Sequence, residues 1–186
     1  MVVSGAAGAV GSVAGQIARL LGCRTVGIAG GADKCAWLTG ELGFDVAIDY
    51  KAGGVRRALG QAAPDGIDIY FDNVGGSILD AALAALRLNG RVVICGAISQ
   101  YNSEQPVVGP SNYLSLLINR ASMTGLIVFD YEHRYEDATN QLLAWIEAGE
   151  LIAREHVVRG GIERFPELLR DLFDGANTGK LVLELV

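Results

Sequence analysis

The sequence has no long apolar run, no cluster of basic residues and no long Pro-rich or Ser-rich linker. Its 186 residues are 51% hydrophobic and 19% charged, with a formal net charge of −6, which is typical of a folded chain with a buried core. No apolar stretch reaches the length of a membrane span. The scattered Lys and Arg residues argue against a nucleic-acid role. We therefore expect neither a membrane nor a nucleic-acid partner.

Cysteine is also scarce. Cys23, Cys35 and Cys95 are odd in number and widely spaced, which forms neither a disulfide framework nor a zinc cluster. His133 and His156 lack metal-ligand spacing and a companion nucleophile. The sequence therefore predicts no metal site. Because no signal peptide precedes the first apolar run and the cysteines suit a reducing compartment, we expect a cytoplasmic protein.

The sequence does contain a regular alternation of short apolar runs and helical patterns. This alternation is typical of a parallel sheet with crossover helices. We expect strands at 1–6, 24–30, 45–50, 67–74, 91–98 and 123–131, and helices at 10–21, 33–43, 55–63, 77–90, 112–121, 135–151 and 162–175, followed by a closing strand at 180–186. Right-handed crossovers then predict an α/β, doubly wound parallel sheet, the Rossmann fold, with strand order 3-2-1-4-5-6. We assign residues 1–150 to this domain and 151–186 to a C-terminal extension.

A glycine cluster follows the first strand directly. Residues 6–11, Ala-Ala-Gly-Ala-Val-Gly, match G-x-G-x-x-G with its first glycine replaced by Ala6. Gly8 would let the backbone approach a pyrophosphate, and Gly11 would let the following helix pack tightly on the sheet. The helix N-terminus would supply free N–H groups and a positive dipole. The alternative is a tight strand–helix turn that binds no ligand.

The end of the second expected strand concerns cofactor choice. An NAD site usually has an acidic residue there for the ribose 2′-hydroxyl, but this strand ends in Ala29-Gly30-Gly31-Ala32. The first acid, Asp33, is placed to cap the next helix. Lys34 follows it and could attract a 2′-phosphate, so the sequence favours NADP over NAD. Lys34 could instead be an ordinary solvated helix residue.

Two more polar, glycine-containing clusters end the fourth and fifth expected strands, at 72–76 and 95–101. Ligands bind beyond the carboxyl ends of strands in such sheets. Asn73 would offer a donor and an acceptor together. We interpret both clusters as walls of the same site, although each could be an ordinary strand–helix turn.

Taken together, these motifs resemble the zinc-independent medium-chain dehydrogenases/reductases, in particular the prostaglandin reductase and 2-alkenal reductase branch. The resemblance extends along essentially the whole chain. The matching stretches are AAGAVGSVAGQIARLLGCRTVGIAGGADKC, LGFDVAIDYKA, PDGIDIYFDNVGG, GRVVICGAISQYN and GPSNYLSLL.

This resemblance implies NADPH-dependent reduction of the activated C=C bond of α,β-unsaturated ketones or aldehydes. By position it implies a pyrophosphate site at the glycine turn, a 2′-phosphate site at Lys34 and Tyr50, and a late asparagine that contacts the cofactor. Tyr101 is the polar candidate nearest the reacting groups, but we do not assign it as an acid catalyst, and the resemblance leaves the catalytic residue unassigned. The implied cofactor-binding residues are Gly8, Ala9, Val10, Gly11, Lys34, Tyr50, Asn73, Cys95, Gly96, Ala97, Ile98, Ser99, Gln100, Tyr101, Leu126, Ile127, Val128 and Asn177.

Family members carry a GroES-like catalytic domain before the glycine turn, and the resemblance implies that this domain is absent here. We therefore expect an NADP-dependent oxidoreductase acting on C=C bonds, of which this chain alone binds NADPH but is weakly active or inactive. The extension 151–186 would pack on that domain. The apolar edge strand 123–131 suggests a homodimer with a sheet continuous through both subunits. Two alternatives stay open: an NADPH quinone oxidoreductase of the same superfamily, and a non-catalytic NADPH-binding module.

Overall fold

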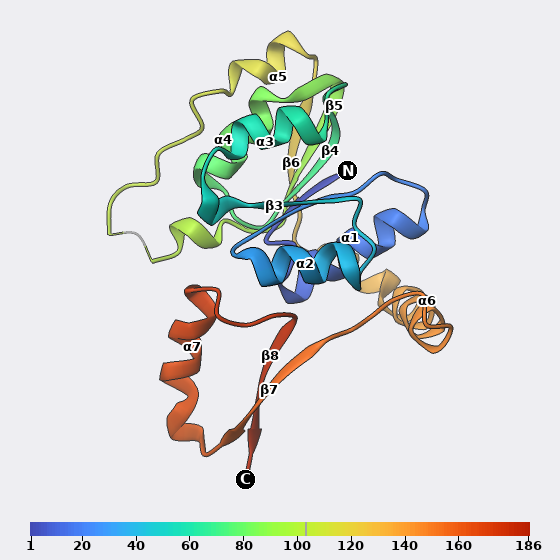
Figure 1. The fold of residues 1–186 in the computed structure, drawn as a ribbon, viewed down its shortest axis with the longest axis vertical. Coiled ribbons are helices and arrows are strands. Elements are labelled where there is room, and N and C mark those ends of the chain that lie inside the picture. Colours follow the sequence, from blue (N-terminus) through green and yellow to red (C-terminus); the bar gives the residue numbers. More distant parts are fainter. Residues whose placement is uncertain (103) are drawn as a thin grey trace.

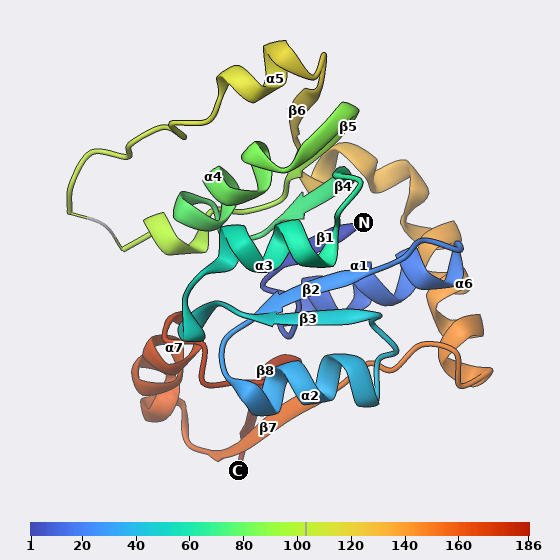
Figure 2. The same cartoon turned by 45° about the horizontal axis from the view of Figure 1, so that its top comes forward.

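The computed structural model describes residues 1–102 and 104–186. Figure 1 shows the fold. Within these residues, six parallel strands form one sheet in the order β3-β2-β1-β4-β5-β6, which confirms the predicted fold class and strand order (Figure 2). The strands are β1 (Val2–Ser4), β2 (Val26–Ala29), β3 (Val46–Asp49), β4 (Ile67–Asp72), β5 (Leu86–Ile94) and β6 (Ser122–Gly125). The order reverses between β1 and β4, so their carboxyl ends form the switch point at which such sheets bind ligands.

Helices cover both faces of this sheet. The α-helices are α1 (Ala9–Leu20), α2 (Ala32–Gly40), α3 (Val55–Ala62), α4 (Gly76–Ala84), α5 (Leu114–Ile118), α6 (Tyr135–Glu147) and α7 (Phe165–Phe173). Short 3₁₀ segments span Tyr50–Ala52, Ile98–Gln100, Val128–Arg134 and Ile162–Arg164.

The described residues form two buried apolar clusters, which correspond to the two faces of the sheet. Leu59 of α3 and Leu83 of α4 belong to the first cluster, together with Tyr70 of β4. Trp37 and Leu38 of α2 belong to the second. Figure 2 shows α3 and α4 on the side of the sheet away from α2. This double coverage explains why the strands are short, nearly continuous apolar runs.

Residues after α6 form a smaller unit beside the large sheet. Strands β7 (Glu155–Gly160) and β8 (Lys180–Leu185) pair in parallel, and α7 connects them (Figure 1). The side chain of Gln16, only 1% exposed, donates to the carbonyl of Ile152 at 3.0 Å and accepts from its N–H at 2.8 Å. The guanidinium of Arg154 lies over the ring of Trp37, 5.3 Å from its centroid. These contacts hold the extension against α1 and α2.

Several element boundaries differ by a few residues from the sequence prediction, and three of them change the interpretation. The helix expected at 77–90 ends at Ala84, and residues from Leu86 onward already belong to β5. Asn89 has φ of 62°, a left-handed conformation that asparagine tolerates, beside a shift in the β4–β5 register. The Asn89-Gly90 pair therefore marks an irregularity inside a strand, and not the end of a helix.

The other two boundaries lie in α2 and β6. Asp33 is not the helix cap: Gly31, with φ of 98°, occupies that position, and Asp33 lies in the first turn. The strand expected at 123–131 is limited to Ser122–Gly125, because Gly125 pairs with Ile94, the last residue of β5. Beyond that point the chain turns into the 3₁₀ segment Val128–Arg134.

Candidate functional site

The turn from β1 to α1 is shaped by three glycines. Gly5 adopts φ of 57°, a conformation that favours glycine. Gly8 is the extended residue before α1 and has no side chain to cap the helix. A Cβ at Gly11 would lie 2.3 Å from the carbonyl oxygen of Gly5, so only glycine lets α1 approach the turn this closely. The first amides of α1 therefore face the end of the sheet, where they can bind an anion.

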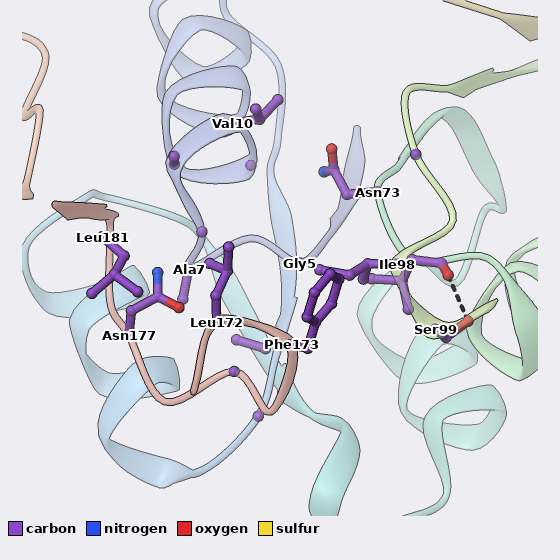
Figure 3. Close-up of a pocket in the computed structure, with 18 of the residues that line it drawn as sticks. Gly5, Ala7, Val10, Asn73, Ile98, Ser99, Leu172, Phe173, Asn177 and Leu181 are labelled. Carbon is purple, nitrogen blue, oxygen red and sulfur yellow. Dashed lines mark hydrogen bonds between the residues drawn. The ribbon is translucent and has the colours of Figure 1, made fainter. Parts of the chain in front are cut away.

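A cavity of about 760 Å³ opens beside this turn (Figure 3). Its volume lies within the range of small-molecule and cofactor pockets. Most residues that the sequence pointed to line it: Gly8, Ala9, Val10, Gly11, Lys34, Tyr50, Asn73, Cys95, Gly96, Ile98, Ser99, Tyr101 and Asn177. The structure thus gathers the glycine turn, the end of β2 and the two clusters after β4 and β5 around one space.

Five other residues named from the sequence do not line this cavity: Ala97, Gln100, Leu126, Ile127 and Val128. The last three follow the short strand β6, and both Ile127 and Val128 are exposed. The N–H of Leu126 still donates to the carbonyl of Ile94, so the chain leaves the sheet directly after Leu126.

Lys34, Tyr50 and Gly30 form the corner of the cavity at the end of β2. A Cβ at Gly30 would lie 2.9 Å from the Tyr50 ring, so the absent side chain makes room for that ring. The Lys34 ammonium donates to the carbonyl of Gly175 at 2.6 Å. Burial and the nearby Lys51 ammonium lower the pKa of Lys34. An ammonium has three donors, so Lys34 retains capacity for an anion in the cavity.

The opposite corner is built at the end of β4. Asn73 donates its side-chain amide to the Ser4 carbonyl at 2.7 Å, and its backbone N–H to the Ser4 hydroxyl at 2.9 Å. The buried Asp72 carboxylate accepts from the Ser4 and Tyr70 hydroxyls at 2.8 and 2.9 Å. Burial and the adjacent Asp72 raise the pKa of Tyr70 well above its usual 10.0, so Tyr70 stays a phenol that can donate.

The loop after β5 completes this side of the cavity. The Ser99 hydroxyl donates to the Val74 carbonyl at 2.6 Å, which ties the loop to the turn after β4. The Tyr101 side chain is 61% exposed, and its hydroxyl accepts from the Ala97 N–H at 3.1 Å. Burial, and secondarily the Asp72 carboxylate, raise the pKa of the Cys95 thiol, which disfavours the reactive thiolate.

The C-terminal extension supplies the remaining wall. Asn177 is 7% exposed and donates to the Gly179 carbonyl at 2.7 Å, while the Gly179 N–H donates to the Ala7 carbonyl at 2.8 Å. In the view of Figure 3, Asn177 and Leu181 lie on the left, Asn73 and Ser99 on the right, and Leu172 and Phe173 between them. The apolar face of α7 joins this wall.

Sequence reasoning did not assign that apolar face to the site. It comprises Phe165, Leu168, Leu169, Leu172 and Phe173. Their spacing (i, i+3, i+4, i+7, i+8) is the amphipathic helix signal, which was readable in the sequence. That signal shows that the face packs against something, but it does not identify the cavity as its neighbour.

Two further findings concern metals and membranes. Across residues 1–102 and 104–186, no group of three or more His, Cys, Asp or Glu side chains lies close enough together to hold a metal ion. No helix in the same ranges is long and apolar enough to cross a membrane. His133 and His156 are both exposed.

The strand order, the glycine turn at a helix N-terminus and the cavity at the switch point define an α/β domain of the dinucleotide-binding type. A family model described as zinc-binding dehydrogenase matches residues 9–147. The chain is 46% identical over 182 residues to a tobacco 2-alkenal reductase (NADP⁺-dependent), which covers 97% of this chain and 52% of that protein. It is 42% identical over 187 residues to bovine prostaglandin reductase 1, covering 99% of this chain and 56% of that protein.

Among solved structures, CurA from Vibrio vulnificus in complex with NADPH matches with a TM-score of 0.93 and 43% identity, over 100% of this chain and 56% of that one. The chain belongs to the zinc-binding dehydrogenase family, in the branch of the prostaglandin and 2-alkenal reductases. It spans about half the length of the relatives that it matches.

Proposed function

We propose that the cavity binds NADPH and that the protein is an NADPH-dependent oxidoreductase. The observation that carries this proposal is the convergence of the glycine turn with the Lys34–Tyr50 corner, in a cavity whose β2 end bears no acidic residue. The small residues in the cavity lining support the fit, since Gly8, Gly30 and Gly96 leave its space free of side chains. The relatives' names support the same choice, because they include an NADP⁺-dependent reductase and an NADPH complex.

In this proposal different groups of residues bind different parts of the cofactor. The amides at Gly8–Gly11 would bind the pyrophosphate through the positive end of α1. Lys34 and Tyr50 would bind the 2′-phosphate and ribose, while Asn73 and the loop 95–101 would hold the nicotinamide half. The segment 126–128 would join the site only if it moved toward the loop after β5.

We propose reduction of the activated C=C bond of α,β-unsaturated aldehydes or ketones as the reaction. NADPH, when bound, supplies a hydride for the β-carbon of the substrate, and the α-carbon takes a proton. The apolar face of α7 would keep water away from this exchange, and Tyr101, which lines the cavity, would orient a substrate carbonyl. Holding the reacting groups in contact and in the right orientation lowers the activation free energy of such a reaction by several kcal/mol.

A quinone oxidoreductase and a non-catalytic NADPH-binding module are the competing activities. NADPH oxidation, followed by absorbance at 340 nm, separates these activities. It is measured with a small alkenal, such as acrolein or 2-hexenal, and in parallel with a benzoquinone. Alkenal turnover with no quinone turnover supports the proposal. The assay needs the full-length protein, including the further domain that the longer relatives carry. The opposite preference then assigns quinone reduction, and tight NADPH binding by the full-length protein without either turnover assigns the binding module.

We also propose two features of assembly. The outer edge of β6 has no neighbouring strand in the described part of the chain. The segments before and after β6 in the sequence expose apolar side chains, including Leu117, Ile118 and Phe129. Such an edge suits pairing with a second copy, which would make a homodimer. The exposed side of the extension 151–186 would pack on a further domain of the kind that makes up the rest of the longer relatives.

Fluorescence titration with NADPH and NADH tests cofactor binding directly. We expect tighter binding of NADPH, and we expect Lys34→Ala to weaken it by about 1–2 kcal/mol, roughly tenfold in affinity, while NADH binding stays unchanged. Arg87→Ala is the control, because Arg87 pairs with Asp68 near the start of β5, away from the cavity. Equal affinity of the parent chain for both cofactors would contradict the assignment of the 2′-phosphate corner.

A further inference from the structure

The end of β4 contains an unusual buried group. Among residues 1–102 and 104–186, Asp72 is the only carboxylate that is fully buried, with an exposed fraction of 0%. No described cation lies within ion-pair distance of it. Burying a carboxylate costs several kcal/mol unless hydrogen bonds replace its water. An apolar residue would fill a core at lower cost, so the position calls for an explanation beyond packing.

Four donors converge on a single oxygen of this carboxylate. Asp72 Oδ1 accepts from the Ser4 hydroxyl at 2.8 Å, the Tyr70 hydroxyl at 2.9 Å, and the N–H groups of Val74 and Gly75, both at 3.0 Å. Two of these donors belong to the turn immediately after β4. The carboxylate therefore fixes the conformation of that turn from beneath, without reaching the cavity itself.

The turn that Asp72 holds lines the cavity and carries the neighbouring loop. Asn73, Val74 and Gly75 all line the cavity. The carbonyl of Asn73 accepts from the Ile98 N–H, and that of Val74 accepts from the Ser99 N–H and hydroxyl. The carbonyl of Asp72 itself accepts from the N–H groups of Cys95 and Gly96. One buried group thus determines where two segments of the same wall lie.

Both segments lie on one half of the fold. In a doubly wound sheet the two βαβαβ halves each bind one mononucleotide of the cofactor. The glycine turn and the Lys34–Tyr50 corner belong to the half formed by β1, β2 and β3, whereas residues 73–75 and 95–99 belong to the half formed by β4, β5 and β6. The adenosine and nicotinamide halves of a cofactor would therefore meet different walls. Ser4 is the member of the Asp72 network that belongs to the first half, and its pairing with Ile28 of β2 holds it in place independently of Asp72.

We infer that Asp72, together with Tyr70 and Ser4, positions the nicotinamide half of the cofactor site and leaves the adenosine half unaffected. Asp72 acts through Asn73 and the turn 73–75, so it is a positioning residue that touches no ligand. This inference rests on the proposed function, because it takes NADPH as the occupant. Loosening the network should release the nicotinamide ring while the 2′-phosphate and adenosine stay bound.

The test compares two probes on the same variants. NADPH covers both halves of the site, and 2′,5′-ADP covers only the adenosine half. For Tyr70→Phe and for Asp72→Asn we expect NADPH affinity to fall by about tenfold, the loss of one hydrogen bond to a charged group. Affinity for 2′,5′-ADP should stay within about twofold of the parent. The fluorescence enhancement of NADPH at saturation should also fall, because the reduced nicotinamide would be more mobile.

Asp68→Asn is the matched control. Asp68 lies on the same strand but is exposed, and its partner is Arg87 at 2.9 Å. Asp68→Asn should leave the affinity for NADPH and the affinity for 2′,5′-ADP unchanged. Tyr70→Phe removes only the hydroxyl and keeps the ring, so it carries the test by itself if Asp72→Asn fails to fold. Circular dichroism shows whether each variant is folded.

Equal weakening of both probes would overturn the inference and reduce the network to a structural role. Unchanged NADPH binding and unchanged enhancement would overturn it as well. If the parent chain binds 2′,5′-ADP and NADPH, but Tyr70→Phe and Asp72→Asn bind both probes as the parent does, only this inference fails. If the parent binds neither probe, the proposed function itself is wrong and the inference falls with it.

Discussion

Gly11→Ala tests the packing of α1 against the turn most directly. The added Cβ would lie 2.3 Å from the Gly5 carbonyl oxygen and 2.9 Å from the Ala6 Cα. Ordinary contacts of this kind begin near 3.4 Å, and both obstacles are backbone atoms that cannot rotate away. The helix must therefore shift by about 1 Å away from the turn that it packs on.

The magnitude follows from two opposing effects. Overpacking of this kind costs about 1–3 kcal/mol, and a backbone obstacle puts it toward the upper end. Replacing glycine with alanine inside a helix returns about 1 kcal/mol. Gly60→Ala isolates that second effect, because Gly60 lies within α3 and nothing occupies the space of its Cβ. We expect Gly60→Ala to stabilise the chain by up to about 1 kcal/mol, and Gly11→Ala to destabilise it by about 1–2 kcal/mol.

Urea unfolding followed by circular dichroism measures both free energies of unfolding. The comparison of the two variants matters more than either value, because both replace a helical glycine with the same residue. NADPH titration of folded Gly11→Ala should show weaker binding, since the shifted helix carries the amides of the proposed pyrophosphate site. If Gly11→Ala is as stable as Gly60→Ala, then α1 does not pack on the turn in the way described and the reasoning fails.

Three other predictions concern pH, the extension and assembly. Because burial and Lys51 lower the pKa of Lys34, its ammonium should lose its proton at a lower pH than an ordinary lysine. The preference for NADPH over NADH, present below that pKa, should then be lost as pH rises through it, at a lower pH than for an ordinary lysine, and Lys34→Arg should preserve it. A preference independent of pH in the parent would contradict this. Gln16→Ala should speed amide hydrogen exchange at Ile152 and loosen the residues after 151, and it should lower the free energy of unfolding by about 2 kcal/mol. Unchanged exchange would show that the two Gln16–Ile152 hydrogen bonds are not needed to hold the extension. Sedimentation should detect a dimer that Met123→Pro on the outer edge of β6 converts to a monomer, and a parent chain that is monomeric at micromolar concentration would contradict the dimer.

The strand order was predictable because it depends on features that a sequence displays openly. Apolar runs alternate with helical spacing, and right-handed crossovers leave few topologies. The half of the cavity built by the glycine turn and by the ends of β2, β4 and β5 was predictable for the same reason, since polar and glycine residues at strand ends gather at one edge.

The remaining features depend on tertiary contacts that no local pattern specifies. The length of β6 is limited by where its neighbour β5 ends, at Ile94, and not by its own apolar residues. The start of β5 has helix-compatible residues around Leu86 and Leu88, but pairing with β4 determines its conformation. The α7 wall was missed because an amphipathic pattern identifies the face that packs and not the surface it packs against.

The hydrogen bond from Gly179 to Ala7 has a consequence for how the molecule folds. It closes a loop that includes nearly the whole chain, whereas β1 meets β2 and β4 across much shorter separations. Contacts between distant residues form slowly, because the entropy of loop closure is lost before the contact is gained. The parallel sheet can therefore assemble first, with its switch-point edge still open to water. On a ribosome, the sheet would precede the cavity by the time needed to make the last two strands, and a competent binding site would be the final product of folding.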